Sequence, residues 1–201
     1  VRQITAALSP TNFVATNPEL IRETFQQSGE NLVRGMKMLA EDIKAGRGSL
    51  KIRQSDASKF QLGVNMATTP GKVVYRNDLM ELIQYAPTTP SVYKRPLLIV
   101  PPWINKYYIL DLRDKNSLVK WATDQGHTTF IISWVNPDEK MAQTSFEDYM
   151  LKGTIEAISQ VCNQTGEDSV NLAAYCIGGT LTMTTLAYMA AKKDKRVNSA
   201  T

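Results

Sequence analysis

Short, continuous apolar runs that alternate with helical patterns restrict the fold of this chain more than any other feature. Such runs occupy residues 96–100, 128–134 and 170–175, and another begins at Val197. Strands without polar alternation are typical of a parallel sheet that is covered on both faces. Helical patterns at residues 114–124, 146–162 and 178–191 separate these runs, as the crossovers of a parallel sheet require. The second half of the chain is therefore predicted to form a doubly wound, mostly parallel α/β sheet.

The first half of the chain shows different patterns. Asn17-Pro18 is typical of a helix start, and apolar residues then recur at helical spacing as far as Ile43. They indicate one amphipathic helix or a helical pair interrupted near Gly29. Two β-branched and aromatic runs, 72–75 and 79–85, predict an antiparallel hairpin at the sheet edge. We therefore expect a helical region over residues 1–70 and an α/β domain over residues 71–201, which ends inside a predicted strand and is expected to be truncated.

The composition argues against several classes of protein. The net charge is only +4, and the basic residues are scattered, so no nucleic-acid-binding surface is expected. Two cysteines and one histidine are too few for a disulfide framework or a zinc site. No apolar run approaches the ~20 residues that span a bilayer, and no signal-peptide pattern is seen at the start. We expect a cytoplasmic protein without a metal, a cofactor or a transmembrane segment.

The segment NLAAYCIGGT, residues 171–180, carries the clearest sign of chemistry. It places Cys176 between a buried strand and a helix, with Gly178 two positions later. This is the layout of the nucleophile elbow, G-x-S-x-G, with cysteine for serine and Ala174 for the first glycine. The helix amino terminus favours the thiolate of Cys176, and the Ile177 N–H faces the place where an acyl oxyanion would develop. The segment predicts an α/β-hydrolase-type fold with Cys176 as the nucleophile; a buried structural cysteine is the alternative.

The loop after the strand at residues 96–100 is a second candidate site. In this fold the loop supplies the second oxyanion N–H, here from Trp103 or Ile104. Its following residues are unusually polar and aromatic: Asn105, Lys106, Tyr107, Tyr108 and Asp111. They either contact substrate, with Asn105 and Asp111 as candidates, or pack at the rim of a pocket.

With these residues in view, the chain resembles the polyhydroxyalkanoate synthases, in particular the single-subunit class I enzymes that use short-chain substrates. The matching stretches are SPTNFVATNP at 9–18, PPWINKYYILDL at 101–112, GHT at 126–128, SWVNP at 133–137 and YCIGGT at 175–180. They extend over essentially the whole chain. The cysteine elbow is moderately specific alone and highly specific together with the NKYYILD stretch.

The resemblance implies an acyltransferase that polymerises (R)-3-hydroxyacyl-CoA into a polyester and releases CoA. It implies Cys176 as the residue that carries the acyl group as a thioester, and it matches Asp111 to a position of functional importance. CoA enters as part of the substrate, so no cofactor is implied. A homodimer in the cytoplasm, associated with polyester granules, is the implied setting.

Two members of the family's catalytic triad have no counterpart at the expected positions. The order nucleophile, Asp, His puts both partners after Cys176, where the chain has Asp194 but no histidine. His127 precedes the strand at 128–134, at the end opposite the elbow, which places it roughly 20 Å from the thiol at ~3.3 Å per residue. We interpret His127 as structural and expect the 201 residues alone to lack turnover.

Two other functions remain open. A polyester depolymerase or esterase would have the same fold, although serine is more usual at its elbow. A non-catalytic granule-binding module is also compatible, because the amphipathic stretch at residues 18–43 could bind a surface. That stretch could equally pack on the α/β domain.

Overall fold

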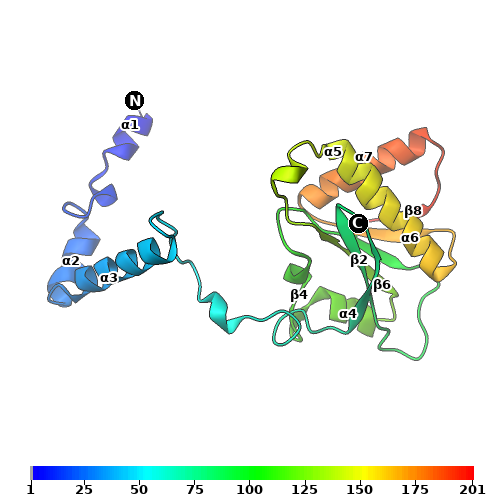
Figure 1. Ribbon diagram of the computed structural model, residues 1–201, viewed down its shortest axis with the longest axis horizontal. Helices are drawn as coiled ribbons and strands as arrows, with labels where there is room; N and C mark the ends of the chain where they lie inside the picture. The colour runs from blue at the N-terminus through cyan, green and yellow to red at the C-terminus, as the bar shows by residue number, and fades with distance from the viewer. Residues whose placement is uncertain (1) are drawn as a thin grey trace. The chain divides into compact units, whose positions relative to one another are not determined.

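The chain forms two compact units in a computed structural model that describes residues 2–201 (Figure 1). The first unit extends to Lys59, and the second is Phe60–Thr201. The predicted boundary lay at residues 70/71. The segment before residue 70 associates with the second unit because Ala67 N–H donates to the Asp111 carbonyl at 2.8 Å. Within residues 2–201, no helix has both the length and the apolarity that crossing a bilayer demands.

The first unit is helical and contains a helical pair. Asn17 caps the first helix of the pair through hydrogen bonds from the N–H groups of Glu19 and Leu20. The pair is interrupted where Ser28 and Gly29 adopt positive φ angles, as the glycine predicted. The helices are α1 (Arg2–Ala7), η1 (Pro10–Asn12), α2 (Pro18–Gln26), α3 (Glu30–Ala45) and η2 (Ala57–Lys59).

The helices α1, α2 and α3 do not form a hydrophobic core of their own. In their described residues, the only fully buried side chain is Asp42, whose carboxylate accepts from Arg53 Nε at 2.7 Å. Large apolar side chains such as Phe25 and Met36 are mostly exposed within this unit. The helices are therefore held by local hydrogen bonds and caps rather than by apolar burial.

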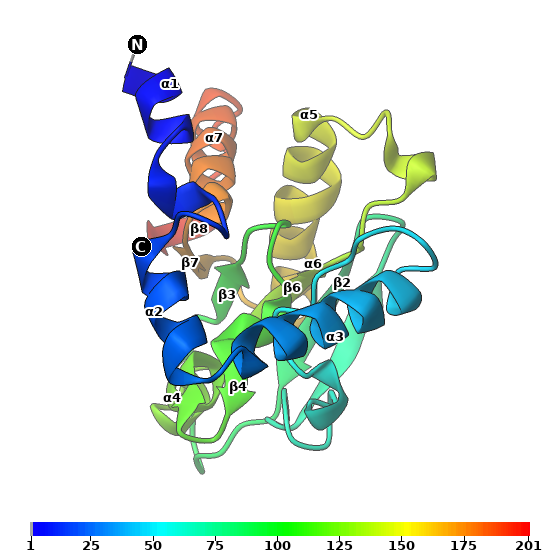
Figure 2. The same ribbon diagram turned by 90° about the vertical axis from the view of Figure 1, so that its left-hand side faces the viewer.

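The second unit is built on a six-stranded sheet of order β1-β2-β6-β3-β7-β8. The last four strands in this order are parallel, and β2 lies beside β6 at one side of them (Figure 2). The strand β2 pairs antiparallel with β6 and also with β1, its partner in the predicted hairpin. This arrangement confirms the predicted α/β-hydrolase-type sheet. The strands are β1 (Gly71–Arg76), β2 (Met80–Tyr85), β3 (Leu97–Val100), β6 (Thr129–Trp134), β7 (Val170–Ala174) and β8 (Val197–Ala200).

Helices cover both faces of the sheet. On one face, Leu98, Phe130 and Leu172 pack in a core with residues of α6 (Glu156–Thr165) and α7 (Ile177–Ala191). On the other face, Ile99 and Ile131 pack against α4 (Leu118–Asp124). The continuous apolar runs of the strands are explained by this burial on both sides.

Two predicted helices differ from the observed ones. The helix predicted over residues 114–124 begins only at Leu118, because a small hairpin of β4 (Asp111–Arg113) and β5 (Asn116–Ser117) precedes it and Ser117 caps it. The helix predicted over 146–162 is divided into α5 (Phe146–Asp148), the π-helical segment η5 (Tyr149–Ile155) and α6. Gly153 of η5 lies directly against the Trp134 ring, where a Cβ would overlap the indole.

Candidate active site

Cys176 occupies the turn between β7 and α7, at the carboxyl edge of the parallel strands. Its backbone has φ 55° and ψ −135°, which L-residues rarely adopt, and it immediately precedes the first residue of the helix. Such a conformation costs about 1–3 kcal/mol and persists only where the surrounding structure imposes it. The side chain is exposed. This is the backbone geometry of a nucleophile elbow.

Gly178 allows the elbow to form, because it lies against the end of β3. A Cβ at this position would be 2.9 Å from the carbonyl carbon of Pro101 and closer still to the Val100 carbonyl oxygen. Gly179, by contrast, faces open space. The motif requires a small residue at position 178 because the start of α7 is in contact with the backbone at the end of β3.

The amino terminus of α7 provides electrostatic stabilisation near the thiol. Ile177 is the first residue of the helix, and the first N–H groups of an α-helix have no acceptor within it. The Cys176 side chain does not cap them. The Ile177 N–H and the helix dipole can therefore stabilise a negative charge that develops beside Cys176.

The Tyr175 phenol and the Cys162 thiol both have raised pKa values. Burial, with a further contribution from Cys176, raises the pKa of the Tyr175 phenol, so Tyr175 is neutral at physiological pH. Burial raises the pKa of the Cys162 thiol on α6, although Arg196 acts in the opposite direction. Cys162 is therefore a protonated thiol that is partly buried, whereas Cys176 is exposed.

The loop after β3 is fixed at its start by an aromatic cluster. The Trp134 Nε1–H, at the end of β6, donates to the Pro101 carbonyl at 2.7 Å in a buried hydrogen bond. The Trp103 ring lies edge-on to Trp134, with centroids 6.4 Å apart, and 4.5 Å from the Tyr149 ring. Ile104 and Asn105, the next residues of the loop, are exposed.

The far end of this loop is joined to the segment after β6. Lys106 Nζ donates to Asn136 Oδ1. Beside this contact is a pocket of about 360 Å³ lined in part by Lys106, Tyr108, Ser133 and Asn136. The predicted site residues Trp103, Ile104 and Asn105 thus belong to a loop that begins at the elbow and ends at this pocket.

Asp111 is buried, with 2% of its surface exposed. Its carboxylate accepts from Thr69 Oγ1 at 2.6 Å and from Ser117 Oγ at 2.7 Å. These hydrogen bonds give Asp111 a structural role, since they join the segment before β1 to the β4–β5 hairpin. A role in substrate binding stays a prediction.

Neither His127 nor Asp194 lies beside Cys176. His127 precedes β6 at the amino edge of the sheet, where Leu97 pairs with Thr129, and its ring lies tilted against the Tyr93 ring with centroids 5.1 Å apart. Asp194 precedes β8 at the same edge.

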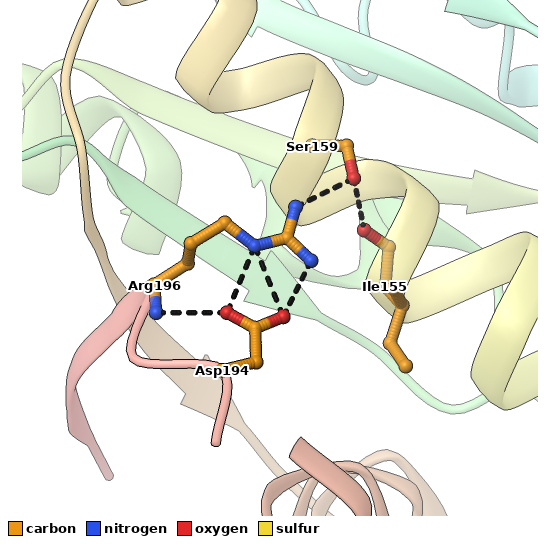
Figure 3. A network of polar contacts seen from close by, with 4 residues as sticks. All are labelled: Ile155, Ser159, Asp194 and Arg196. Atoms are coloured by element: carbon orange, nitrogen blue, oxygen red, sulfur yellow. Dashed lines mark hydrogen bonds and ion pairs between the residues drawn. The ribbon is translucent and has the colours of Figure 1, made fainter. Parts of the chain in front are cut away.

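The carboxylate of Asp194 is already occupied by a guanidinium. It accepts from Arg196 Nη2 at 2.6 Å and from Nε at 3.0 Å, while Arg196 Nη1 reaches Ser159 on α6 at 2.8 Å (Figure 3). Ser159 Oγ in turn donates to the Ile155 carbonyl. This network fastens the α7–β8 turn to α6. Among residues 2–201, no group of three or more potential metal ligands is found.

Sequence reasoning missed the part played by Trp134. The residue was assigned only to a buried strand, although a buried indole N–H nearly always finds an acceptor. A tryptophan at the carboxyl end of a strand adjacent to β3 was the available signal.

Comparison with known proteins places this chain in a family. Residues 1–122, more than half of the chain, match the profile of a family described as "Poly-beta-hydroxybutyrate polymerase (PhaC) N-terminus". This chain belongs to that polymerase family. The resemblance predicted from the sequence motifs is therefore confirmed.

Curated relatives agree with this assignment. The poly(3-hydroxyalkanoate) polymerase of Methylorubrum extorquens is 58% identical over the whole chain, which covers 33% of that protein. The corresponding polymerase subunit of Cupriavidus necator is 44% identical, again over the whole chain and 33% of the relative. The chain thus spans about a third of the length of the curated relatives it matches.

Solved structures of lower similarity were also matched. A putative lipase from Sulfolobus solfataricus has a TM-score of 0.44 and 15% identity, over 60% of this chain and 46% of the lipase. The carboxylesterase CesB from Bacillus subtilis has a TM-score of 0.40 and 14% identity, over 65% and 41% of the two chains.

Proposed function

We propose that the full-length protein containing this chain is a class I polyester synthase that polymerises (R)-3-hydroxyacyl-CoA and releases CoA. Family membership supports the polymerase activity, and Cys176 at the strained β7–α7 turn is the observation that supports a thiol mechanism. Cysteine rather than serine at the elbow favours a synthase over a depolymerase or esterase, because a thioester can exchange with CoA at nearly equal energy.

The proposed reaction has two steps at Cys176. The thiolate attacks the acyl carbon of the CoA thioester, the bond from that carbon to the CoA sulfur breaks, and CoA leaves as its thiol after taking up a proton. The 3-hydroxyl of another acyl unit then attacks the enzyme thioester, loses its proton to a base and forms an ester, which frees the Cys176 thiol. Each step passes through a tetrahedral oxyanion.

Two backbone donors are proposed to stabilise that oxyanion. One is the N–H of Ile177, which has no acceptor within α7. The other is the N–H of Trp103 or Ile104, in the loop that starts beside Gly178. Asn105 and Asp111 are retained as proposed contributors to substrate binding. The donors act without reorganisation because the sheet, the helix and the aromatic cluster hold them in place.

The general base is proposed to come from an Asp–His pair elsewhere in the full-length protein. Within this chain the single histidine lies at the opposite edge of the sheet, and Asp194 is paired with Arg196. The 201-residue chain by itself is therefore expected to show no turnover.

Replacement of the thiol tests the proposal directly. In the full-length protein, Cys176→Ala is expected to abolish the covalent acyl adduct that mass spectrometry detects after mixing with 3-hydroxybutyryl-CoA. Cys162→Ala is the matched control, because Cys162 is a protonated thiol on α6, and it should retain the adduct. Loss of the adduct in the Cys162 variant alone would show that the assignment is wrong. Ester hydrolysis without CoA release by the wild-type protein would favour the esterase instead.

The first unit is proposed to bind the surface of polyester granules in the cytoplasm, within a homodimeric enzyme. The exposed apolar side chains of α2 and α3 support this, since an amphipathic helix binds an apolar surface through such a face. Deletion of residues 1–50 from the full-length protein should release it from granules in a sedimentation assay. Unchanged granule binding would reject this role.

A further inference from the structure

Trp134 and Gly178 contact the same peptide group from different elements. The Pro101 carbonyl oxygen accepts the Trp134 indole N–H at 2.7 Å. The carbonyl carbon of Pro101 also lies where a Cβ on Gly178 would approach to 2.9 Å. The point at which the chain leaves β3 is therefore held between α7, which carries Cys176 at its start, and β6, which carries Trp134 at its end.

The Pro101 carbonyl is the group through which the backbone N–H donors of the loop after β3 can be fixed, because two prolines begin that loop. Pro101 and Pro102 have no backbone N–H, so Trp103 has the first N–H of the loop after Val100. No backbone donor of residues 101 and 102 is available to fix this stretch. The indole hydrogen bond to the Pro101 carbonyl supplies the fixation from a neighbouring strand.

Trp134 is itself rigidly held. It pairs with Met80 at the end of the β2–β6 ladder, and only 8% of its surface is exposed. Gly153 of the π-helical segment lies against its ring, and the Tyr149 ring is 5.2 Å away. A side chain confined in this way can hold its hydrogen-bond partner in one position.

We propose that Trp134 is a positioning residue for acyl transfer, whose indole N–H holds the loop at residues 101–106 so that its N–H groups meet the oxyanion formed at Cys176. The proposal rests on the proposed polymerase function and adds a residue to it. Trp134 does not touch the reacting atoms; it acts through the Pro101 carbonyl. Loss of the indole N–H would leave a buried carbonyl unpaired and free the loop to shift, and small displacements of a catalytic donor reduce the rate strongly.

Two reactions of the same thiol separate this role from a general structural one. Acylation by a CoA thioester develops an oxyanion at the carbonyl, so it depends on the loop donors. Alkylation by iodoacetamide joins the sulfur to a saturated carbon and displaces iodide, and it develops no oxyanion. Both reactions depend equally on the thiolate fraction of Cys176 and on access to it.

The experiment uses Trp134→Phe in the full-length protein, which keeps an aromatic ring and removes the N–H. Single-turnover acylation by (R)-3-hydroxybutyryl-CoA is followed by rapid quench and mass spectrometry, and iodoacetamide alkylation of Cys176 is followed in parallel. We expect acylation to slow by ~10- to 100-fold, with the substrate concentration for half-maximal rate and the alkylation rate changed less than ~2-fold. A tenfold loss corresponds to about 1.4 kcal/mol in the barrier.

The matched control is Trp121→Phe. Trp121 is on α4, on the other side of the sheet, and 57% of its surface is exposed. Both of its rates should equal those of the wild-type protein. If Trp134→Phe does not fold, benzothienylalanine introduced at position 134 keeps the size of the indole and removes only the N–H.

The outcomes distinguish the hypotheses. Equal slowing of acylation and alkylation would mean that Trp134 only maintains the fold, and unchanged acylation would mean that the loop needs no tether; either result overturns the proposal. Absence of an acyl adduct in the wild-type protein would instead overturn the proposed function, and this inference with it.

Discussion

Replacement of Gly178 by alanine should destabilise the protein. The added Cβ would lie 2.9 Å from the carbonyl carbon of Pro101 and closer to the Val100 carbonyl oxygen, whereas unstrained contacts between heavy atoms lie at ~3.5–4.0 Å. Both neighbours are backbone atoms at the end of a central strand, so α7 has to retreat by roughly 1 Å. Overpacking of this kind costs about 1–3 kcal/mol, against which the better helix propensity of alanine offsets up to ~1 kcal/mol. The expected net loss is about 1–2 kcal/mol.

Gly179→Ala is the matched control, one residue further along the same helix. Apart from the adjoining backbone of α7, no described atom lies within 4 Å of the place that its Cβ would occupy, so only the propensity gain of up to ~1 kcal/mol remains. The assay is thermal unfolding of the two full-length variants and the wild-type protein under identical conditions. A change of 1 kcal/mol moves the midpoint by about 2–4 °C in a domain of 150–250 residues. The midpoint of Gly178→Ala should fall, and that of Gly179→Ala should be equal to the wild type or higher.

A wild-type midpoint for Gly178→Ala would refute the reasoning, because it would mean that α7 and β3 do not meet at this glycine. Equal losses in both variants would refute it as well, since they would point to a common requirement for flexible backbone rather than to a specific contact. The acylation rate of Gly178→Ala should also fall, because the retreat of α7 separates Ile177 from the loop after β3.

Two further predictions concern side chains away from the elbow. A hydrogen bond from Arg196 lowers the pKa of Asp194 below its ordinary value of 3.8, so the charged carboxylate stabilises the fold at neutral pH, and this contribution is lost as the pH falls through the lowered folded-state pKa. The thermal midpoint of Asp194→Asn should therefore be below that of the wild type at pH 7. Thermal unfolding between pH 7 and pH 2.5 should show this difference in midpoint becoming smaller below about pH 3.9. A difference that stays constant with pH would contradict the coupling between the Asp194 charge and stability. The Tyr85 hydroxyl is buried without a hydrogen-bond partner. Tyr85→Phe should therefore leave the free energy of unfolding, measured by urea denaturation, unchanged or raise it by up to ~1 kcal/mol. A clear loss of unfolding free energy would show that the hydroxyl has a partner in solution.

The features that sequence reasoning predicted correctly are those fixed by local patterns. The β1–β2 hairpin and the strands β3, β6, β7 and β8 follow from apolar and β-branched runs, which burial on both faces requires. The interruption of the first helical region follows from Gly29, which adopts φ 86°. The position of Cys176 between a strand and a helix follows from the residues on either side of it.

The features that were missed depend on residues far apart in the chain. The helix α4 starts late because Ser117 serves both as its cap and as a donor to the buried Asp111. The π-helical segment faces the Trp134 ring through Gly153. The hydrogen bond from Trp134 to Pro101 spans 33 positions, and no periodicity within either segment could indicate it.

The aromatic cluster also has a practical consequence for following the reaction. Of the three tryptophans in this chain, Trp103 on the loop after β3 and Trp134 at the end of β6 lie with their rings together, while Trp121 is exposed on α4. Indole emission shifts with the polarity around the ring, so loading of an acyl chain onto Cys176 should change the fluorescence of the first two, while the third gives a steady background. Trp103 and Trp134 are therefore expected to report the proposed acylation of Cys176 optically, and Trp121→Phe would remove the background that this chain contributes.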